Sequence, residues 1–443
     1  MSNVKIKPMR WSAPTPVLMI IRRAGLPAVL FLLLVVGGTT RNAAQAAPPP
    51  TTLTPIYETG AGWAAGEYTV AIAFGDVDGD GRNEMAIARQ AATGPRILLV
   101  DDATTGFALL TTLGGGWGVA GRPTAVAFGN VDGDPAAELV VARVSPVNER
   151  AQVFDDATAG YAPLMTFGAE WPAAVSAVGA AFGDVDGDGR AELGLISDAT
   201  TGPRVFLYDD AEGGFVPLWS GAETWGAAAT GTDIALGDAD GDGDAEIAFS
   251  RNHDSNARYF VHDGPPDFGL LHQGGEAWGA GSFATAVAFG NVDDDPAAEL
   301  GVTRRASLNE RAIVLDDAAA GFATLTQFGQ TWSANAWATD IAFGDADGDG
   351  RDEVALSRMT TINARVLLFD DGQPGAGRPP FALLSSRGEE WLGEEYATSV
   401  ALGDVDGDGL AEMAYGRFAT TGARVFVVRA GWMGWVPFVS NTN

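Results

Sequence analysis

Clustered carboxylates are the residues of this 443-residue sequence best suited to chemistry. The first cluster, GDVDGDGRNE at 75–84, carries Asp76, Asp78, Asp80 and Glu84. Counting from Asp76, positions 1, 3 and 5 place three carboxylates in one tight turn, position 7 (Arg82) can offer its carbonyl, and position 9 adds the glutamate. Hard oxygen ligands without nitrogen or sulfur favour calcium over zinc. The loop is therefore predicted to bind calcium.

Two other interpretations of this loop are weaker. An EF-hand needs a glutamate at position 12 and a helix on each side. Position 12 here is Ile87, and the flanking segments alternate as strands do. The second alternative is a solvated acidic turn without a metal, but three carboxylates within five residues repel one another when no cation is present. The metal site is the better interpretation.

The acidic heptapeptide recurs seven times along the chain. The copies are GDVDGDG at 75, GNVDGDP at 129, GDVDGDG at 183, GDADGDG at 237, GNVDDDP at 290, GDADGDG at 344 and GDVDGDG at 403. Successive copies are 54, 54, 54, 53, 54 and 59 residues apart. A nearly constant step of this length indicates an array of one supersecondary unit.

Each unit has the pattern of four strands. Val70, Ile72 and Phe74 alternate with small residues before the first acidic loop. The segments EMAIAR and RILLVDD follow it, and a fourth segment opens with Gly-Phe, as in GFALLTTL. Seven such units, with no helical pattern after residue 50, predict an all-β, seven-bladed β-propeller with four antiparallel strands per blade. Each acidic loop then joins the first two strands of a blade.

The sequence contains one candidate too many for the fourth strands. Residues 54–60 resemble a fourth strand, and residues 435–439 align with another. Either end of the chain could close the ring. We favour the C-terminal segment as the last strand of blade 7, with the N-terminal segment packed beside it.

The acidic units resemble the FG-GAP or VCBS repeat found in integrin α-subunit propellers and in many exported bacterial proteins. The segment AFGDVDGDGRNEMAIA at 73–88 is similar to the signature of that repeat, and the resemblance covers about 57–439. It implies a β-hairpin loop that holds calcium between the first two strands of a blade. Position 9 is glutamate throughout this chain, where the family usually has aspartate. The longer side chain is still expected to reach the metal.

The resemblance carries the ligand set over to five complete loops, position by position. The predicted ligands are Asp76, Asp78, Asp80, Arg82 and Glu84; Asp184, Asp186, Asp188, Arg190 and Glu192; Asp238, Asp240, Asp242, Asp244 and Glu246; Asp345, Asp347, Asp349, Arg351 and Glu353; and Asp404, Asp406, Asp408, Leu410 and Glu412. Five occupied sites would cancel ten charges.

Two loops depart from the pattern and are expected to be weak or empty. Their candidate ligands are Asn130, Asp132, Asp134 and Glu138, and Asn291, Asp293, Asp295 and Glu299. Both have asparagine at position 1, and Pro135 or Pro296 replaces the glycine at position 6. Proline cannot adopt a positive φ, so a left-handed turn would have to be rebuilt there. The expectation is about five calcium sites, and seven if the two proline loops also bind.

The N-terminal segment is predicted to be a cleaved signal peptide, residues 1–46. Basic residues precede the apolar run LPAVLFLLLVVGG at 26–38, and AAQAA at 43–47 offers a cleavage site after Ala46. An uncleaved membrane anchor is the alternative, but the run is shorter than the roughly 18 apolar residues of a spanning helix. Residues 47–56 are then a short linker, and 57–443 form the propeller. Secretion, or exposure at the cell surface, follows.

The remaining composition narrows the possible partners. The chain has no cysteine, so metals would have to do the work of disulfides in an exported protein. Removal of 1–46 takes six basic residues and leaves 21 Lys and Arg against 57 Asp and Glu, a balance of −36. This charge disfavours nucleic acid and anionic membranes. After cleavage no membrane span is expected, and we expect a monomer.

A second set of repeated residues is expected on the face opposite the acidic loops. A tryptophan stands twelve residues before the motif glycine, and an arginine twelve residues after the loop glutamate, in all seven units. Six units have another arginine at the end of strand two. Candidates for contacting a ligand on this face are Arg89, Arg96, Trp117, Arg143, Arg150 and Trp171. Residues needed seven times are more simply explained as wedges between blades or as partners of neighbouring carboxylates.

The functional prediction is a non-catalytic extracellular binding or adhesion module that meets a protein or a glycan. An enzyme acting on an extracellular polysaccharide or phosphodiester is the first alternative, and a purely structural surface protein is the second. The three histidines, His253, His262 and His272, all lie in the fourth unit and are best explained as scattered residues. No nucleophile elbow or phosphate-binding loop occurs in the sequence, and no catalytic residue is predicted.

Overall fold

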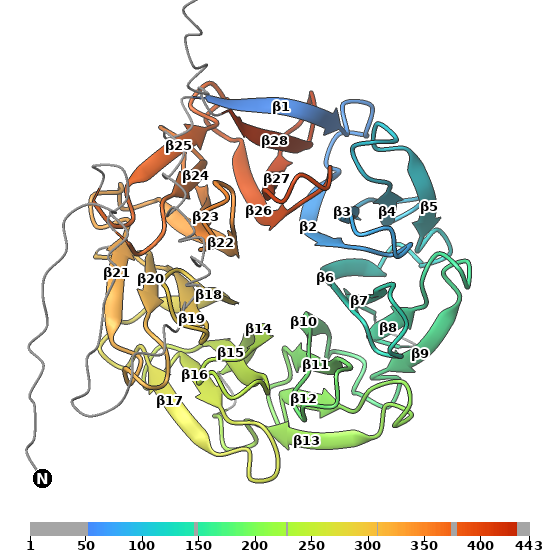
Figure 1. Ribbon diagram of the computed structural model, residues 1–443, viewed down its shortest axis with the longest axis vertical. Coiled ribbons are helices and arrows are strands. Elements are labelled where there is room, and N and C mark those ends of the chain that lie inside the picture. The colour runs from blue at the N-terminus through green and yellow to red at the C-terminus, as the bar shows by residue number, and fades with distance from the viewer. Residues whose placement is uncertain (1–51, 146–148, 227–228, 308, 374–378, 432–443) are drawn as a thin grey trace, which may run out of the picture. The chain divides into compact units, whose positions relative to one another are not determined.

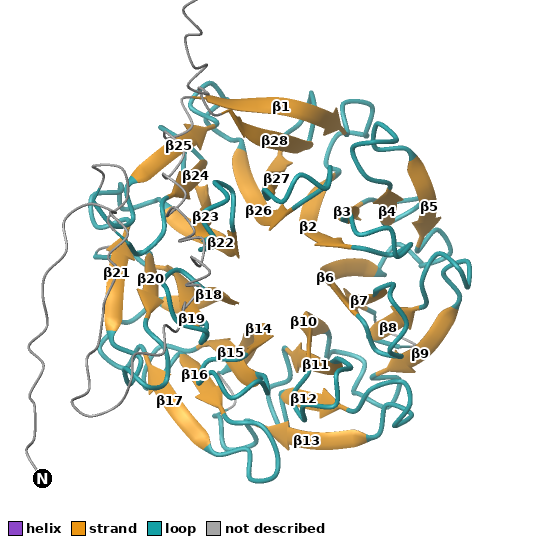
Figure 2. Cartoon of the chain, viewed as in Figure 1, coloured by secondary structure: helices purple, strands orange, loops and turns teal. Residues whose placement is uncertain are grey.

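The computed structural model describes residues 52–145, 149–226, 229–307, 309–373 and 379–431. These residues form seven four-stranded antiparallel sheets arranged as blades around a central channel (Figure 1). Strands and loops account for all of them, without a helix (Figure 2). The predicted all-β, seven-bladed β-propeller is confirmed.

Each blade runs from an inner strand beside the channel to an outer strand at the rim. The blades are β2 (Tyr68–Gly75), β3 (Glu84–Gln90), β4 (Ile97–Val100) and β5 (Leu109–Leu113); β6 (Arg122–Gly129), β7 (Glu138–Val144), β8 (Ala151–Phe154) and β9 (Pro163–Phe167); β10 (Ala177–Gly183), β11 (Glu192–Ser197), β12 (Val205–Tyr208) and β13 (Pro217–Gly221); β14 (Thr230–Gly237), β15 (Glu246–Asn252), β16 (Tyr259–His262) and β17 (Leu270–Gly274); β18 (Phe283–Gly290), β19 (Glu299–Arg305), β20 (Ala312–Leu315) and β21 (Thr324–Phe328); β22 (Trp337–Gly344), β23 (Glu353–Met359), β24 (Val366–Phe369) and β25 (Leu383–Arg387); and β26 (Tyr396–Gly403), β27 (Glu412–Phe418), β28 (Val425–Gly431) and β1 (Thr52–Thr59).

The second strand of each blade is buried where it follows the acidic loop. In β3, the residues from Glu84 to Ala88 are all buried, because this strand lies between two others and under the neighbouring blade. The strand therefore begins with a buried glutamate at the base of the acidic loop. The same is true of the second strand of every blade.

The fourth strands begin later than the sequence pattern suggested. Gly106 and Phe107 have positive φ values of 74° and 59°, so they form a turn, and β5 starts only at Leu109. Phe107 is still important, because its ring is buried beneath the turn. The predicted Gly-Phe opening of the strand is therefore the turn before it.

The ring is closed by the N-terminal strand, which corrects the expectation that the C-terminal segment closes it. Strand β1 pairs directly with β28 in an antiparallel register from Thr52↔Gly431 to Thr59↔Val425, at the top of Figure 1. The backbone N–H of Arg424 donates to the carbonyl of Thr59, as that of Arg96 donates to Leu113 in blade 1. The N-terminal segment thus provides the same hydrogen bonds as an ordinary outer strand.

Two predicted boundaries are affected by this closure. The propeller begins with β1 at Thr52, so the predicted linker at 47–56 extends too far and the propeller starts before residue 57. Leu53 is buried in the core of blade 7, which shows that this segment is part of the domain. The predicted closing segment at 435–439 and the predicted signal peptide at 1–46 lie outside the described residues.

Neighbouring blades approach closely at the glycine that precedes each acidic loop. A Cβ atom on Gly75 would lie 2.4 Å from the Cβ of Phe128, and one on Gly129 would lie 2.3 Å from the Cβ of Phe182. Only a residue without a side chain fits at this distance. The motif glycine is therefore required by packing between blades, and the apolar core lies in these contacts, as in the cluster that joins Val140 and Leu193.

Replacing Gly129 with alanine should destabilise the protein by about 1 to 3 kcal/mol, because overpacking forces a shift of the next blade. The matched control is Gly115→Ala, at an exposed glycine with ordinary φ and no atom near its missing Cβ. Chemical unfolding of the two variants measures the difference. Equal stability would contradict the packing role.

Candidate functional site

The first acidic loop is a tight turn whose carboxylates are held by its own backbone. Asp76 Oδ1 accepts the N–H of Gly79 at 2.7 Å, and its Oδ2 accepts that of Gly81 at 2.8 Å. Asp80 Oδ1 accepts the N–H of Arg82 at 3.0 Å. Asp78 Oδ1 accepts the N–H of Asp80 at 3.2 Å, so the carboxylates of positions 1, 3 and 5 are all held by backbone N–H groups of the turn.

The position-9 glutamate lies at the base of the same turn. Glu84 is fully buried, and its Oε2 accepts the N–H of Val77 at 2.7 Å. Its second oxygen, Oε1, is buried without a hydrogen-bond partner, and Asp76, Asp78 and Glu84 each place an oxygen within 4.8 Å of the others. A buried carboxylate oxygen normally has a partner. Glu84 is therefore an exception to the usual pairing of buried polar atoms.

Burial dominates the electrostatics of the seven glutamates. The pKa of Glu84 is raised to about 8 by desolvation, against the hydrogen bond from Val77, and the charges of Asp78 and Asp76 raise it further. The pKa is also raised to about 8 for Glu138, Glu192, Glu246 and Glu299, to about 10 for Glu353 and to about 7 for Glu412. A nearby cation would remove this penalty, because it favours the ionised carboxylate.

The structure adds acidic residues that the sequence pattern of the loops does not include. Two aspartates, Asp101 and Asp102, follow β4, and Asp102 lies with Asp80 and Glu84 in a group whose oxygens are within 4.8 Å of one another. Equivalent groups include Asp155 or Asp156 with Glu138. The repeated Asp-Asp pair, five and six residues after the invariant arginine, was the available signal.

The residues at position 7 were predicted to offer carbonyls, and three of them place a guanidinium beside the loop. Arg82 pairs with Asp80 at 2.6 Å and lies 3.7 Å from Asp102. Arg190 and Arg351 contact the equivalent aspartates. At Asp244 and Leu410 the backbone N–H donates to the position-5 aspartate, as it does in the arginine loops. None of the guanidiniums of Arg82, Arg190 and Arg351 bonds to Oε1 of the glutamate in its own loop, and that oxygen has no partner.

The two proline loops are rebuilt in the same way. Gly81 has a φ of 86°, which Pro135 and Pro296 cannot adopt. Asn130 Nδ2 donates to the carbonyl of Asp134, and Asn291 Nδ2 donates to that of Asp295. An asparagine can make this bond and an aspartate cannot, which explains why asparagine and proline occur together. Glu138 and Glu299 keep the unpartnered Oε1, so weak binding at these loops stays a prediction.

The acidic loops are connected to one another around the ring. The carbonyl of Asp76 accepts the N–H of Ala137, and that of Val77 accepts the N–H of Ala157, both in blade 2. The same bonds at the seam join Asp404 to Asn83 and Val405 to Ala103. The order of one loop therefore supports the loop of the next blade.

The invariant arginines are buried wedges. All seven are at most 1% exposed. Arg204 donates to the carbonyls of Ala199 at 2.9 Å, Gly202 at 2.7 Å and Ala222 at 3.0 Å. Arg96 and Arg150, both candidates for the ligand face, are equally buried and donate to carbonyls of the loop that leads to the next blade. The geometry supports the wedge, with carbonyl rather than carboxylate partners.

The second set of arginines stacks on the repeated tryptophans. Arg143 lies 4.4 Å from the centre of the Trp117 ring and pairs with Glu149. Arg89 lies 5.0 Å from Trp63 and pairs with Glu67. Trp171 has Phe206 stacked on it at 4.8 Å. The tryptophans other than Trp391 remain half-buried, so their rings are partly accessible on this face.

The three histidines of blade 4 lie in separate surroundings. His253 contacts the carbonyl of Ser255, His262 bonds to the carbonyl of Phe268 at 2.9 Å, and His272 stacks on Phe322. Burial lowers the pKa of His262 and of His272. Their different partners agree with the interpretation of scattered residues.

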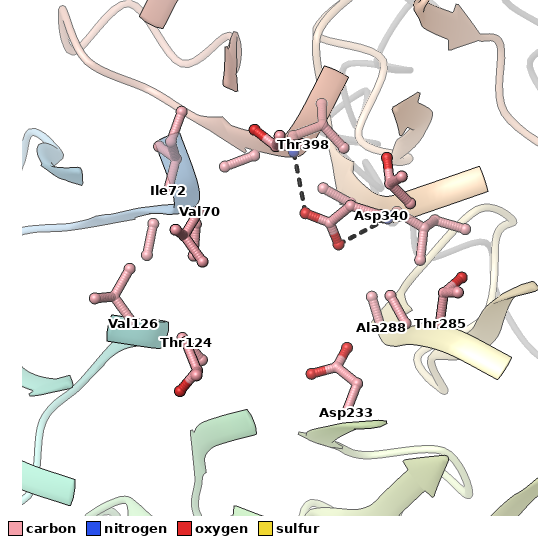
Figure 3. Close-up of a pocket in the computed structure, with 18 of the residues that line it drawn as sticks. Val70, Ile72, Thr124, Val126, Asp233, Thr285, Ala288, Asp340 and Thr398 are labelled. Carbon is pink, nitrogen blue, oxygen red and sulfur yellow. Dashed lines mark hydrogen bonds between the residues drawn. The ribbon is translucent and has the colours of Figure 1, made fainter. Parts of the chain in front are cut away.

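The central channel holds a polar cavity of about 400 Å³ that no sequence motif predicted. Threonines from five blades line it: Thr124, Thr232, Thr285, Thr339 and Thr398. Asp233 and Asp340 point into the same space (Figure 3). Desolvation raises the pKa of each aspartate to about 7.

Both channel aspartates also tie neighbouring blades together. Asp340 Oδ2 accepts the N–H of Val400 at 3.1 Å, and its Oδ1 accepts that of Ile341 at 3.0 Å (Figure 3). Asp233 accepts the N–H of Val287 from blade 5 at 3.0 Å. Both channel aspartates therefore already have structural partners, whereas the buried hydroxyl of Thr398 has none.

The comparison with family models agrees with this geometry. Residues 184–249 match the model described as the FG-GAP-like repeat, from the acidic loop of blade 3 to β15. The fold and the repeated loops define a seven-bladed β-propeller. The chain carries an FG-GAP-like repeat, and the other blades reproduce the strands and loops of the matched segment. No curated protein matches the chain.

Several solved structures are similar to the chain at low sequence identity. Chaetomium thermophilum Raptor is 13% identical with a TM-score of 0.55, over 88% of this chain and 29% of Raptor, so the chain spans less than a third of that protein. Bacillus licheniformis rhamnogalacturonan lyase PL11 is 15% identical with a TM-score of 0.47, over 85% of this chain and 75% of the lyase. An Agrocybe aegerita lectin that recognises non-reducing terminal N-acetylglucosamine is 11% identical with a TM-score of 0.47, over 75% of this chain and 84% of the lectin.

Among the described residues, no helix is long and apolar enough to cross a membrane.

The channel aspartates generate a pH prediction. A carboxyl group with a raised pKa in the folded protein makes the fold lose stability as pH rises from its ordinary pKa to the raised one. Asp340→Asn removes this titration. The unfolding free energy of the wild type relative to the variant should therefore fall, by up to about 1.4 kcal/mol per pH unit, between about pH 4 and about pH 7. Urea unfolding at several pH values measures it. The control is Asp267→Asn at an exposed position, and a pH-independent difference at Asp340 would contradict the prediction.

Proposed function

We propose that the protein is a secreted, calcium-stabilised binding module without catalytic activity. The observation that carries the calcium part is the buried, unpartnered Oε1 of the loop glutamate, which is found at Glu84, Glu138, Glu192, Glu299 and Glu353. A buried charge without a partner is costly, and the surrounding ligands are all oxygens. Calcium fits this donor set and would supply the missing partner.

Calcium would act as a structural cation in this proposal. Each loop connects the first two strands of its blade, and its backbone bonds to the next blade. The position-9 glutamate would then hold the ion against the start of strand two, while the aspartates hold it against the turn. Without cysteine, the exported chain would rely on these ions in place of disulfides.

The binding part of the proposal rests on the opposite face. Beside Trp391 a cavity of about 380 Å³ is lined by Tyr415, Phe426, Arg417 and Glu395. A similar cavity of about 400 Å³ lies beside Trp225. Aromatic rings next to fixed charges suit a sugar ring or a protein side chain. The proposed partner is an extracellular glycan or protein.

An enzyme is the second candidate, because Asp233 and Asp340 share the channel with pKa values near neutrality. A carboxyl group with such a pKa could exchange a proton with a substrate. The backbone N–H donors on both carboxylates favour the structural role instead. A substrate would be an extracellular polysaccharide or phosphodiester.

Removal of calcium should lower the melting temperature, because an ion that binds only the folded state stabilises it by about 2.7 kcal/mol per site at a hundred times its Kd. Glu192→Gln should reduce the number of bound calcium ions by one and shrink the thermal shift that EDTA causes. Isothermal titration and differential scanning calorimetry measure both. Glu170→Gln, an exposed glutamate on the opposite face, is the control and should bind as the wild type does. A melting temperature insensitive to EDTA would overturn the structural role.

A glycan array probed with and without EDTA separates the two candidate functions. Calcium-dependent retention of a glycan without product release is expected for the binding module. Trp225→Ala should reduce this retention, because it removes a half-buried ring beside the second cavity. Release of a cleaved glycan that stops in Asp233→Asn would show an enzyme instead.

A further inference from the structure

Blade 7 differs from the others at the end of its third strand. In blade 1 the residues five and six positions after the invariant Arg96 are Asp101 and Asp102. In blade 7 the residues at the same distance from Arg424 are Arg429 and Ala430. The substitution removes two carboxylates and introduces a cation.

The Arg429 side chain reaches into the acidic loop of its own blade. Its Nε donates to Glu412 Oε1 at 2.9 Å, its Nη2 pairs with Asp406, and its Nη1 lies 4.0 Å from Asp408. Glu412 is buried, and its Oε1 is equivalent to the oxygen that has no partner in Glu84. In blade 7 the guanidinium is that partner.

We infer that Arg429 is a built-in cation that takes the place of the metal in blade 7. Its three nitrogens contact the position-3, position-5 and position-9 carboxylates, which are the groups that would surround the ion. A calcium ion and a guanidinium cannot share these oxygens, since both are cations and both need the same lone pairs. The residues of blade 7 therefore do not fit a metal, and the predicted site at Asp404, Asp406, Asp408 and Glu412 is one that this chain fills with its own arginine.

The arginines of the other loops do not have this role. Arg82, Arg190 and Arg351 bond to the position-5 aspartate and to the aspartate pair, and Oε1 of the loop glutamate stays unpartnered in all three blades. They come from position 7 of the loop itself. Arg429 comes from strand β28 and bonds to the glutamate directly. Whether an arginine reaches Oε1 of the loop glutamate therefore depends on which strand or loop carries it.

Arg429 lies in the blade where the two ends of the described chain meet and close the ring. Strand β28 carries Arg429 and pairs with β1, so it is the strand onto which the N-terminal segment closes (Figure 1). Thr54 is the register partner of Arg429. A covalently attached cation keeps a positive charge beside Asp406, Asp408 and Glu412 whether or not calcium is present. The other blades would lose their cation in a chelator, and the closing blade would not.

A reciprocal exchange tests this inference, which rests on the proposed calcium binding of the other loops. Arg429→Asp with Ala430→Asp rebuilds the ordinary acidic pair in blade 7 and should add one calcium ion per chain in isothermal titration. Asp101→Arg with Asp102→Ala copies blade 7 into blade 1 and should remove one. As a single substitution in the otherwise unchanged chain, Glu412→Gln should leave the number of bound calcium ions unchanged. The single substitution Glu192→Gln should lower that number by one. Loss of an ion in Glu412→Gln would overturn the inference.

A measurement in EDTA keeps the test independent of calcium binding. Arg429→Gln should lower the melting temperature in EDTA by several degrees, because Glu412 loses its partner. Arg122→Gln, at an exposed arginine of β6, is the control and should change it little. If the wild type binds no calcium, the proposed function fails, and the inference is decided by this comparison alone. Equal melting temperatures for the two variants would overturn the built-in cation.

Discussion

Neutralisation of the loop carboxylates is the constraint on which the rest of the structure depends. Each blade gathers several acids at the start of its second strand, and one of them, the glutamate, is buried in the interior. Desolvation and mutual repulsion act in the same direction there, which raises the pKa of every one of the seven glutamates. The fold thus has seven buried carboxyl groups whose ionised form would be favoured by a nearby positive charge, from a metal ion or a guanidinium.

Backbone hydrogen bonds connect each acidic loop to the next blade. Each acidic loop offers the carbonyl of its position 1 to the acidic loop of the next blade, and in five of the seven the carbonyl of position 2 also accepts an N–H from that blade, so a disordered loop would remove partners from its neighbour. On the opposite face, the buried arginines tie the loops together through carbonyls and the channel aspartates join inner strands. Close packing of the motif glycine against the next blade leaves no space for adjustment. Hydrogen bonds between the acidic loops, hydrogen bonds of the buried arginines and channel aspartates, and packing at the motif glycines all join neighbouring blades. These contacts connect the blades without disulfides.

The acidic loops and the stacked tryptophans and arginines lie on opposite faces of the propeller, and the proposed function rests on this separation. The acidic loops, which join the first two strands of each blade, lie on one face. The tryptophans and the arginines stacked on them lie on the other, where half-buried rings border cavities between blades. A ligand on that face would meet a surface whose geometry is fixed by buried wedges such as Arg204. Structural cations on one side would therefore serve to keep a rigid surface on the other.

The sequence by itself determined the features that are local to one repeat. Seven copies of the motif, the alternating strands and the left-handed glycines are all contained in short segments, so the blade number, the order of the strands within a blade and the places of the acidic loops could be predicted. Only the tertiary structure decided the long-range pairings. The choice of β1 as the closing strand depends on contacts between the two ends of the chain. The approach of Asp102 to Glu84, and of Arg429 to Glu412, depends on how one strand packs beneath the loop of another, and no pattern within a single strand specifies that distance.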